Sequence, residues 1–346
     1  MKFNSILLIL FSALYGMAQE NSIVKLRTIA FYNVENLFDT ENDSLTYDDD
    51  RTPTGKDHWT DDRYIHKINN ISKVLSEIGA HKINSSPDII GLCEIENSKV
   101  LQDLIAHPNL EGSKYGFIHF DSPDERGIDV GLLFKKAVFL PTSFVSRRLL
   151  LQNDEGERDY TRDQLVVGGI LDDVQIYFII NHWPSRSGGE ASSKPNRIAA
   201  ALLNKSIIDS ILKIDEGAKI ISMGDYNDDP IDESFKKILK TRGSKKGIEP
   251  NELYNPMEKL FKKGIGSLAY RDNWNLFDQF FITSSLLENN WDSYRLWKAD
   301  VFRPSYLIVS NGKYKGYPFR TYSGGNYTGG YSDHFPVYMY LIKKLQ

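Results

Sequence analysis

The sequence is poor in cysteine and lacks long apolar runs, and each absence narrows the class of protein. A single cysteine, Cys93, occurs among 346 residues, which excludes an intramolecular disulfide framework and any zinc or iron–sulfur site built from several thiolates. No run of about 18 apolar residues is present, so no transmembrane helix and no stable membrane insertion are expected. The formal net charge of −4 disfavours a protein that coats nucleic acid nonspecifically, but it leaves open an enzyme that acts on a phosphodiester.

Two common hydrolase motifs are also missing. The chain has no G-x-S-x-G nucleophile elbow, and its 7 histidines include no H-E-x-x-H pair. A serine hydrolase and a zinc hydrolase of that type are therefore disfavoured. What remains is the composition of a folded globular protein, with 41% hydrophobic and 25% charged residues.

The first residues have the pattern of a secretory signal peptide. Lys2 supplies a positive charge, residues 6–14 form a short apolar run, and Gly16-Met17-Ala18 offers small residues for cleavage. We therefore predict a signal peptide over residues 1–18, one domain over residues 19–346, and export to the periplasm or out of the cell. A buried first strand or helix is the alternative interpretation of the apolar run.

Short β-type runs alternate with amphipathic stretches along the rest of the chain. Apolar residues, Ile65 among them, recur at spacings of three and four after Asp61 and predict a helix. Pro195 is placed to open a long helix with Leu202 on its inward side, and a short helix is expected at 98–106. The expected strands are 26–34, 88–95, 115–120, 129–134, 164–171, 174–180, 219–223, 277–283 and 335–342. This alternation predicts sheets covered by helices in a single domain.

Polar residues directly follow or precede several of the expected strands. They are Asn33-Val34-Glu35-Asn36, Glu94-Ile95-Glu96-Asn97, Asn181-His182, Gly224-Asp225-Tyr226-Asn227 and Ser332-Asp333-His334. Any one of these groups is compatible with an ordinary turn, because Asn, Asp and Gly are common there. Histidine and glutamate are poor turn formers, however, and carboxylate and amide oxygens are the ligands that Mg²⁺ prefers. The set therefore indicates metal-assisted chemistry on a phosphoester, which needs a base and groups that offset negative charge.

Together these residues resemble the endonuclease/exonuclease/phosphatase superfamily, which includes deoxyribonuclease-I-like enzymes. The matching positions follow the family's order along nearly the whole chain: Asn33, Glu94, His182, Gly224-Asp225-Tyr226-Asn227, Asp278 and Ser332-Asp333-His334. The resemblance implies a four-layer α/β sandwich, in which two facing β-sheets are flanked by helices and the active site lies at one edge.

The resemblance also implies a divalent-metal site. Glu94 is similar to the family's principal Mg²⁺ ligand, with Asn33 beside it, Glu35 as an acidic second contact and Asp333 near the metal. Mn²⁺ or Ca²⁺ is an alternative or assisting ion. One residue departs from the pattern: deoxyribonuclease-I-like enzymes place a DNA-contacting basic residue two positions after the metal glutamate, where this chain has Glu96. That difference disfavours tight minor-groove binding.

Four positions carry the core of the implied chemistry. Asp225 resembles the residue that activates the attacking water, and Asn227 resembles the residue that positions this water or a phosphate oxygen. His334 resembles the histidine that contacts the scissile phosphate, with Asp278 as its carboxylate partner. A carboxylate in that position favours the imidazolium form of a histidine.

Five further positions complete the predicted site. His182 resembles the second family histidine, which contacts the phosphate and is able to protonate the leaving oxygen, and we predict Asp129 as its orienting carboxylate. Arg162 resembles an arginine that relatives use on phosphate. Arg186 and Arg126 are additional candidates for phosphate binding.

These roles predict a secreted Mg²⁺-dependent phosphodiester hydrolase, with a nuclease of low sequence specificity, monomeric and acting on DNA or RNA, as the preferred interpretation. A phosphoesterase for sphingolipid headgroups or for inositol or sugar phosphates is the alternative enzyme. A catalytically inactive binding module on the same scaffold is a third interpretation. Such a module would lack some of the charged positions, and none is missing here.

Overall fold

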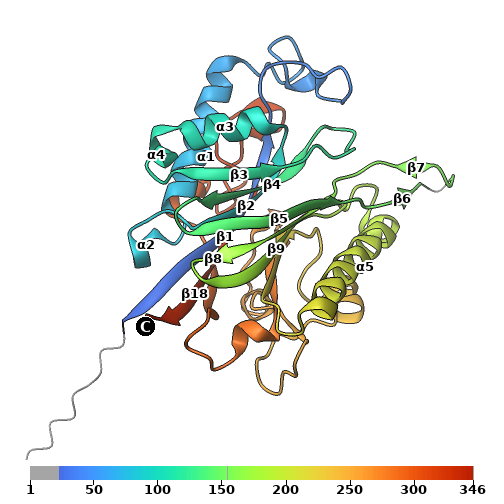
Figure 1. Ribbon diagram of the computed structural model, residues 1–346. Coiled ribbons are helices and arrows are strands. Elements are labelled where there is room, and N and C mark those ends of the chain that lie inside the picture. The colour runs from blue at the N-terminus through green and yellow to red at the C-terminus, as the bar shows by residue number, and fades with distance from the viewer. Residues whose placement is uncertain (1–22, 154, 346) are drawn as a thin grey trace, which may run out of the picture.

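Two six-stranded β-sheets lie face to face in the computed structural model, and helices cover both outer faces (Figure 1). The structure describes residues 23–153 and 155–345. The predicted signal peptide over residues 1–18 lies outside this range. The order of layers is helices, sheet, sheet and helices, which confirms the predicted four-layer α/β sandwich.

The first sheet contains the N-terminal and C-terminal strands side by side. In spatial order its strands are β15 (Arg295–Val301), β18 (Val337–Lys344), β1 (Val24–Leu37), β2 (Ile89–Ile95), β4 (Asp129–Lys135) and β3 (Tyr115–His119). The central neighbours β1 and β2 are parallel, and every other pair is antiparallel. The carboxyl ends of β1 and β2 therefore lie at the same edge of the sheet.

The second sheet repeats this plan. Its strands, in spatial order, are β11 (Leu253–Tyr254), β14 (Asp278–Thr283), β10 (Ile220–Asp225), β9 (Val174–His182), β8 (Gln164–Leu171) and β5 (Phe139–Arg147). Again the central neighbours β9 and β10 are parallel. Each sheet thus brings the ends of two parallel strands to one edge.

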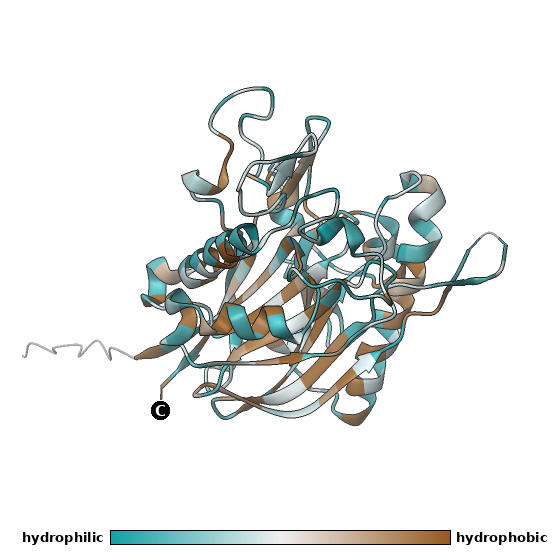
Figure 2. Cartoon of the chain, turned by 90° about the horizontal axis from the view of Figure 1, so that it is seen from above, coloured by the Kyte–Doolittle hydropathy of each residue, from teal (hydrophilic) through white to brown (hydrophobic). Residues whose placement is uncertain are grey.

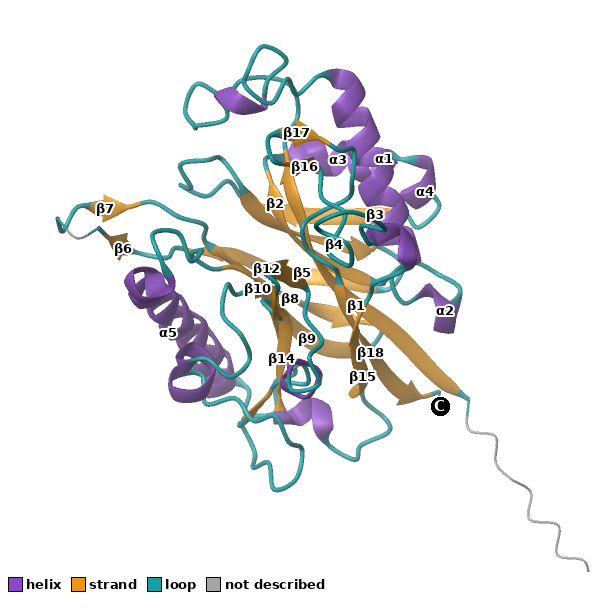
Figure 3. Ribbon diagram, turned by 180° about the vertical axis from the view of Figure 1, so that it is seen from behind, coloured by secondary structure: helices purple, strands orange, loops and turns teal. Residues whose placement is uncertain are grey.

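Helices and short two-stranded sheets complete the chain. The helices are α1 (Asp61–Glu77), α2 (Ala80–Ile83), α3 (Ser98–Ala106), α4 (Pro108–Glu111), α5 (Glu190–Ile214) and α6 (Glu258–Phe261). The short sheets pair β6 (Leu151–Gln152) with β7 (Arg158–Asp159), β12 (Leu268–Tyr270) with β13 (Asn273–Asn275), and β16 (Tyr322–Ser323) with β17 (Asn326–Tyr327). Single helical turns occur at Asp49–Arg51, Ser234–Ile238, Ser284–Leu287 and Ser305–Leu307. Helices α1, α3 and α4 lie on the side of the first sheet and α5 on the side of the second (Figure 3).

All nine expected strands are present, with boundaries that shift by a few residues. Three strands of the two sheets were not expected from the sequence: the two-residue edge strand β11, and the longer strands β5 and β15. Both longer strands lie at the edge of a sheet, where fewer side chains are buried and the apolar pattern that marks a strand is weaker. In β5, for example, Leu140, Phe144 and Val145 are exposed.

The two long helices, α1 and α5, bury most of the apolar residues predicted to face the core, with two corrections. Ile65 and Leu202, expected to face the core, are 63% and 53% exposed. Helix α5 begins at Glu190 rather than at Pro195. Side-chain hydrogen bonds stabilise this extra N-terminal turn: the Ser193 hydroxyl donates to Gly189 O, and the Arg197 guanidinium donates to Glu190 O.

The main core fills the space between the sheets and beneath α1 and α3, and a second apolar cluster lies beneath α5. Apolar residues accordingly gather along the strands, while the loops are mostly polar (Figure 2). The sheets approach closely where Gly91 of β2 meets Met223 of β10: an added Cβ would lie 2.9 Å from the Met223 sulfur. In the part of the chain that the structure describes, no helix combines the length and the apolar character that a membrane crossing requires.

Candidate active site

The polar strand ends predicted from the sequence meet at one edge of the sandwich. Glu94 lies on β2 and Asn33 on β1, whereas His182 and Asp225 end β9 and β10 of the opposite sheet. Asp278 opens β14 and pairs in register with Asp225. The parallel pair in each sheet explains this convergence, because parallel strands end at the same edge.

Glu94 is presented by a bulge in β2. The pairing of β2 with β4 shifts between Cys93 and Ile95, and Glu94 has a φ of 60°. This conformation is costly for a glutamate, and such costs concentrate at functional sites. Asn33 Nδ2 donates to Oε1 at 3.1 Å and the Asn36 backbone N–H donates to Oε2 at 2.9 Å. The Glu94 carboxylate is thereby fixed while its side chain stays 14% exposed.

Asn33 connects the two sheets. Its Nδ2 also donates to Asp225 Oδ2 at 3.0 Å, and its Oδ1 accepts from the Glu35 backbone N–H at 2.9 Å. The amide nitrogen, not the oxygen, faces both carboxylates. In this arrangement Asn33 positions Glu94 and Asp225, and its role as a metal ligand stays a prediction.

Asp225 is held by the sequence around it. An added Cβ on Gly224 would lie 2.5 Å from the Asn181 carbonyl oxygen, so only glycine allows β10 to run this close to β9. The Asn227 backbone N–H donates to Asp225 Oδ1 at 3.0 Å, and Asn227 Nδ2 donates to Trp183 O at 3.0 Å. Asn227 has a φ of 51°, which asparagine tolerates well. Burial raises the pKa of Asp225 to about 6.

His334 and Asp278 form the predicted pair. His334 Nδ1 lies 2.6 Å from Asp278 Oδ2, and Asp278 is fully buried. Ser332 fixes the preceding turn, because its hydroxyl donates to Asn33 O at 2.7 Å and accepts from the His334 backbone N–H at 3.1 Å. Burial disfavours the imidazolium, but the carboxylates of Asp278 and Asp225 outweigh it and raise the pKa of His334 well above its usual range. His334 therefore carries a positive charge at neutral pH.

His182 has the opposite character. Burial and then the charges of Arg162 and Arg126 lower its pKa well below the usual range, so the ring is neutral at neutral pH. Its Nδ1 is buried without a hydrogen-bond partner among the described residues. The prediction that Asp129 orients His182 is wrong: Asp129 lies in the other sheet, and its oxygens lie 3.0 Å from His119 Nε2 and accept from the Ser122 backbone N–H at 2.9 Å.

Four side chains face one small volume at this edge. His182 Nε2 lies 3.8 Å from both Glu94 Oε1 and Asp225 Oδ2, and His334 Nε2 lies 3.9 Å from the same Asp225 oxygen. These spacings are too long for direct hydrogen bonds, so the groups are free to contact a shared water or phosphate oxygen that lies beside them. The two histidines thus offer one charged and one neutral imidazole on either side of a carboxylate.

The donor set suits a divalent cation. Among the described residues no lysine or arginine nitrogen lies within the 4.0 Å ion-pair distance of Glu94 or Asp225. Their negative charge is therefore not neutralised by a direct partner of that kind. Oxygen donors with uncompensated charge fit Mg²⁺ or a similar hard cation. Asp225, Asp278 and His334 bring ligand atoms within 4.8 Å of one another at this edge, and His119, Asp121 and Asp129 do so elsewhere, where Asp121 is exposed.

Glu35 and Asp333 share a basic partner that the sequence analysis missed. Arg320 Nε donates to Glu35 Oε1 at 3.1 Å and its NH2 group donates to Asp333 Oδ2 at 3.0 Å. The other Glu35 oxygen accepts from the Thr321 backbone N–H at 2.6 Å. Each oxygen of Glu35 thus accepts one hydrogen bond, and its role as a metal contact stays a prediction. Asp333 keeps one oxygen without a side-chain partner among the described residues, and it remains a candidate ligand beside Glu94.

Lys67 lies behind this cluster and is almost fully buried. Its ammonium donates to Thr321 Oγ1 at 2.5 Å and to Tyr331 O at 2.6 Å, and burial lowers its pKa to about 8 despite the charge of Glu35. A lysine on the apolar stripe of α1, directly before Ile68, is a signal that the sequence offered. Arg320 gave no such signal, because its place depends on a loop.

Arg162 contacts the backbone of Trp183, the residue after His182, and the charges of Arg162 and Arg126 lower the pKa of His182. Arg162 is buried, donates to Asp124 Oδ2 at 3.0 Å and to Trp183 O at 2.8 Å, and keeps a buried Nε without a partner among the described residues. The Arg126 side chain is 48% exposed. Both positions are compatible with the predicted contact to a phosphate.

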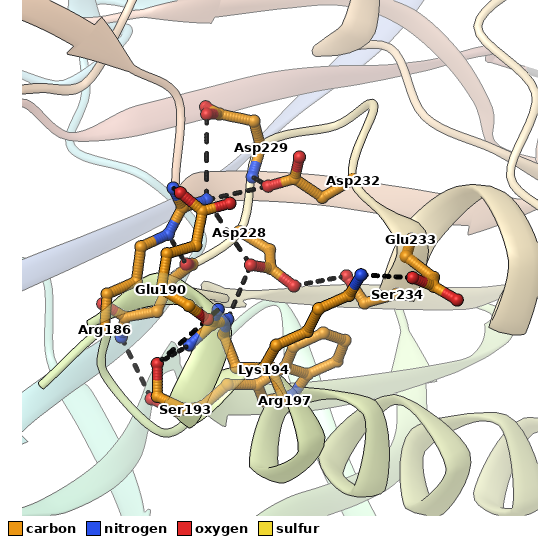
Figure 4. Close-up of polar contacts among 12 residues, drawn as sticks. Arg186, Glu190, Ser193, Lys194, Arg197, Asp228, Asp229, Asp232, Glu233 and Ser234 are labelled. Atoms are coloured by element: carbon orange, nitrogen blue, oxygen red, sulfur yellow. Dashed lines mark hydrogen bonds and ion pairs between the residues drawn. The ribbon is translucent and has the colours of Figure 1, made fainter. Parts of the chain in front are cut away.

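Arg186 belongs to a different structure. Its NH2 group lies 2.8 Å from Asp232 and 3.4 Å from Asp228, and its Nε donates to Asn227 O at 2.9 Å (Figure 4). The guanidinium also lies over the Phe277 ring, 4.6 Å from its centre. With these donors engaged Arg186 holds the loop after Asp225, and its role in phosphate binding stays a prediction.

A sandwich of this kind, with carboxylates and histidines gathered at one edge, defines a class of hydrolases that act on phosphoric esters. A sequence model of the Endonuclease/Exonuclease/phosphatase family matches residues 28–343, and the chain belongs to this family. It is a hydrolase acting on phosphoric ester bonds, in a family whose enzymes depend on divalent metals. No curated protein sequence matches it.

Solved structures share the fold at low sequence identity. A humanized D. rerio TDP2 with 14 mutations is 14% identical over 91% of this chain and 98% of its own, with a TM-score of 0.54. An endonuclease/exonuclease/phosphatase family protein from Bacteroides thetaiotaomicron is 17% identical over 94% and 100%, with a TM-score of 0.54. The mannosyl-6-phosphatase Bt3783 from Bacteroides thetaiotaomicron is 16% identical over 91% and 99%, with a TM-score of 0.51.

Proposed function

We propose that the protein is an exported, Mg²⁺-dependent phosphodiesterase, and specifically a nuclease of low sequence specificity. The observation that carries this proposal is the meeting of Glu94 Oε1, Asp225 Oδ2 and the Nε2 atoms of His182 and His334 around one volume. The structure of D. rerio TDP2 complexed with single-strand DNA product, 15% identical over 91% of this chain with a TM-score of 0.52, supports nucleic acid as the substrate class.

In the proposed reaction water attacks phosphorus and the ester oxygen leaves. Asp225 accepts a proton from the attacking water, and its contacts to Asn33 and Asn227 hold the accepting oxygens in place. His334 places an imidazolium beside the phosphate, where its charge stabilises the developing negative charge. His182 is neutral in the free protein, so it serves there as a hydrogen-bonding group, and a solvent water supplies the proton that the leaving ester oxygen needs.

Glu94 and Asp333 are the residues that we propose to hold the cation. A bound Mg²⁺ would offset negative charge on the phosphate in the transition state. Arg320 donates to Asp333 and keeps that carboxylate oriented at the edge. Arg162 and Arg126 add positive charge on the His182 side of the volume.

A phosphomonoesterase is the second candidate, favoured by the fold shared with mannosyl-6-phosphatase Bt3783. A single panel separates the two. Purified protein is incubated with Mg²⁺ or with EDTA on plasmid DNA, a single-stranded oligonucleotide, RNA, an aryl phosphomonoester, mannose 6-phosphate and sphingomyelin. The nuclease proposal expects cleavage of nucleic acid that EDTA abolishes. Inert nucleic acid alongside rapid hydrolysis of a monoester or of sphingomyelin would replace it.

Export and a monomeric state are proposed on the sequence pattern of residues 1–18 and on the completeness of the site within one chain. Expression of the full chain with fractionation tests the first, and the mass of the mature protein identifies a cut after Ala18. A mature chain that keeps residues 1–18 would contradict the signal peptide. Light scattering tests the second.

A further inference from the structure

A hollow of about 680 Å³ lies beside the catalytic edge, within the range of ligand sites. Its walls come from the β12–β13 hairpin and from residues 309–328, which are distant in the sequence. We name it the tyrosine pocket, after Tyr270, Tyr314, Tyr317 and Tyr322 in its lining. Arg320 lines it too, and the same guanidinium donates to Asp333. The tyrosine pocket therefore opens directly beside the proposed cation site.

A row of aromatic rings connects His334 to this pocket. Phe335 follows His334 and is stacked with Trp274, with ring centres 6.1 Å apart and planes 9° apart. Trp274 contacts Tyr317 at 6.0 Å, and Tyr317 contacts Tyr314 at 5.7 Å. The inner end of the row is buried at Phe335 and the outer end is exposed. The row therefore holds the pocket tyrosines at a fixed position relative to the catalytic histidine.

The outer rings are exposed and accompanied by cations. Tyr270 is 62% exposed and Tyr314 is 46% exposed. The Arg271 guanidinium lies 5.1 Å from the centre of the Tyr270 ring, and the Lys313 ammonium lies 5.5 Å from that of Tyr314. Arg320 is paired with Glu35 and Asp333, so the lining offers two further cations, Arg271 and Lys313, each over one face of an exposed tyrosine ring. This combination matches sites that stack bases and bind the connecting phosphates.

The hydrogen-bonding groups of the pocket disfavour a sugar. Recognition of several hydroxyl groups needs free carboxylates or amides, and Asp272 is the one carboxylate in the lining. It accepts from the Tyr317 hydroxyl at 2.7 Å. The one amide, Asn311, donates to the Ser310 hydroxyl. A flat ring with a phosphate is the better match.

We propose that the tyrosine pocket binds an unpaired base of a single-stranded nucleic acid, with the adjacent phosphate contacting Lys313, Arg271 or both. This inference rests on the proposed nuclease function and narrows its substrate to single strands. A paired base cannot lie between the tyrosines, because its faces are covered by neighbouring bases. Cleavage of single strands is therefore faster than cleavage of the same sequence as a duplex.

The test compares two substrates in the presence of Mg²⁺: a single-stranded oligonucleotide and methyl 4-nitrophenyl phosphate, which is too small to reach the pocket tyrosines. Tyr314→Ala removes an exposed ring whose aromatic contact is with Tyr317, so the fold is retained. The ratio of kcat/KM for the oligonucleotide to that for the small diester falls at least about fivefold. Trp297→Ala is the matched control, because Trp297 is 45% exposed on β15 and lies outside the pocket. Its ratio is unchanged.

A charge variant adds an independent measurement. Lys313→Ala raises KM for the oligonucleotide and makes its dependence on log salt shallower by about one unit, as expected for a lost phosphate contact. If the wild type cleaves oligonucleotides and Tyr314→Ala leaves the ratio of the two kcat/KM values unchanged, the proposed base binding in the pocket is wrong, but the proposed nuclease function is not. A wild-type enzyme that leaves every nucleic acid intact overturns both, and this result is evident before any variant is made.

Discussion

The loop after Asp225 depends on a buried ion pair, and Arg197→Met tests that dependence. The Arg197 side chain is 1% exposed, and its Nε donates to Asp228 Oδ1 at 2.6 Å (Figure 4). The rest of the guanidinium donates to Ser193 Oγ at 2.9 Å and to the carbonyls of Ser185 and Glu190. Methionine fills a similar length but supplies none of these donors.

Breaking one side of a buried pair costs about 3–5 kcal/mol, since the other charge stays buried. Here Asp228 keeps two partners, because Ser234 Oγ donates at 2.7 Å and the Arg186 NH2 group lies at 3.4 Å. The lower end, about 3 kcal/mol, is therefore expected. At about 2–4 °C per kcal/mol this corresponds to a fall in Tm of roughly 6–12 °C.

Thermal and urea unfolding of the purified variant measure the loss. The matched control is Asp209→Asn on the same helix, where Lys205 and Asp209 form an exposed pair at 2.7 Å. Exposed pairs of this kind contribute little, and the control shifts stability by less than about 0.5 kcal/mol. If Arg197→Met changes stability no more than Asp209→Asn, the loop is not held by this pair and the argument is refuted.

Three further predictions concern other parts of the site. Burial raises the pKa of Asp229 to about 7, so the folded state binds an extra proton between about pH 4 and 7, and stability falls as pH rises through this range. Asp229→Asn keeps an oxygen for the Leu276 N–H, so in urea unfolding it is more stable than wild type at pH 8 and equal to it below pH 4. A wild-type protein more stable than Asp229→Asn at pH 8 would contradict the raised pKa. Mg²⁺ raises the Tm of the wild type because it binds the folded state, and Glu94→Gln removes most of this rise; an equal rise in both would place the cation elsewhere. Gly224→Ala costs about 1–3 kcal/mol by overpacking and lowers kcat, measured by unfolding and by phosphodiester hydrolysis, whereas full stability would show that β10 has room to move.

The fold was predictable because its signals are local or periodic. The residues Ile68, Ile71 and Val74 recur on one face of α1 and are buried, as their spacing predicts. Those residues of the site that lie at the ends of strands were also predictable. Glu94 and Asp225 come together because parallel neighbours in each sheet end at one edge.

What the sequence did not reveal depends on where loops place charged groups. Nothing in the sequence near Arg186 and Arg320 distinguishes their roles. In the structure Arg186 pairs with carboxylates of the loop after Asp225, whereas Arg320 bridges Glu35 and Asp333. Asp129 was assigned to the wrong histidine for the same reason: His119, ten residues earlier on the neighbouring strand, lies against it. Pairings of this kind follow from tertiary contacts that have no fixed spacing in the sequence.

The most direct test of the account is the hydrolysis of a single-stranded oligonucleotide by Asp225→Asn in the presence of Mg²⁺. The substitution keeps the shape of the side chain and removes the carboxylate that accepts the proton from water. The account predicts a fall in kcat of about 10²–10⁴, together with a cooperative unfolding transition like that of the wild type. Turnover equal to that of the wild type would contradict the assignment of this edge as the catalytic site.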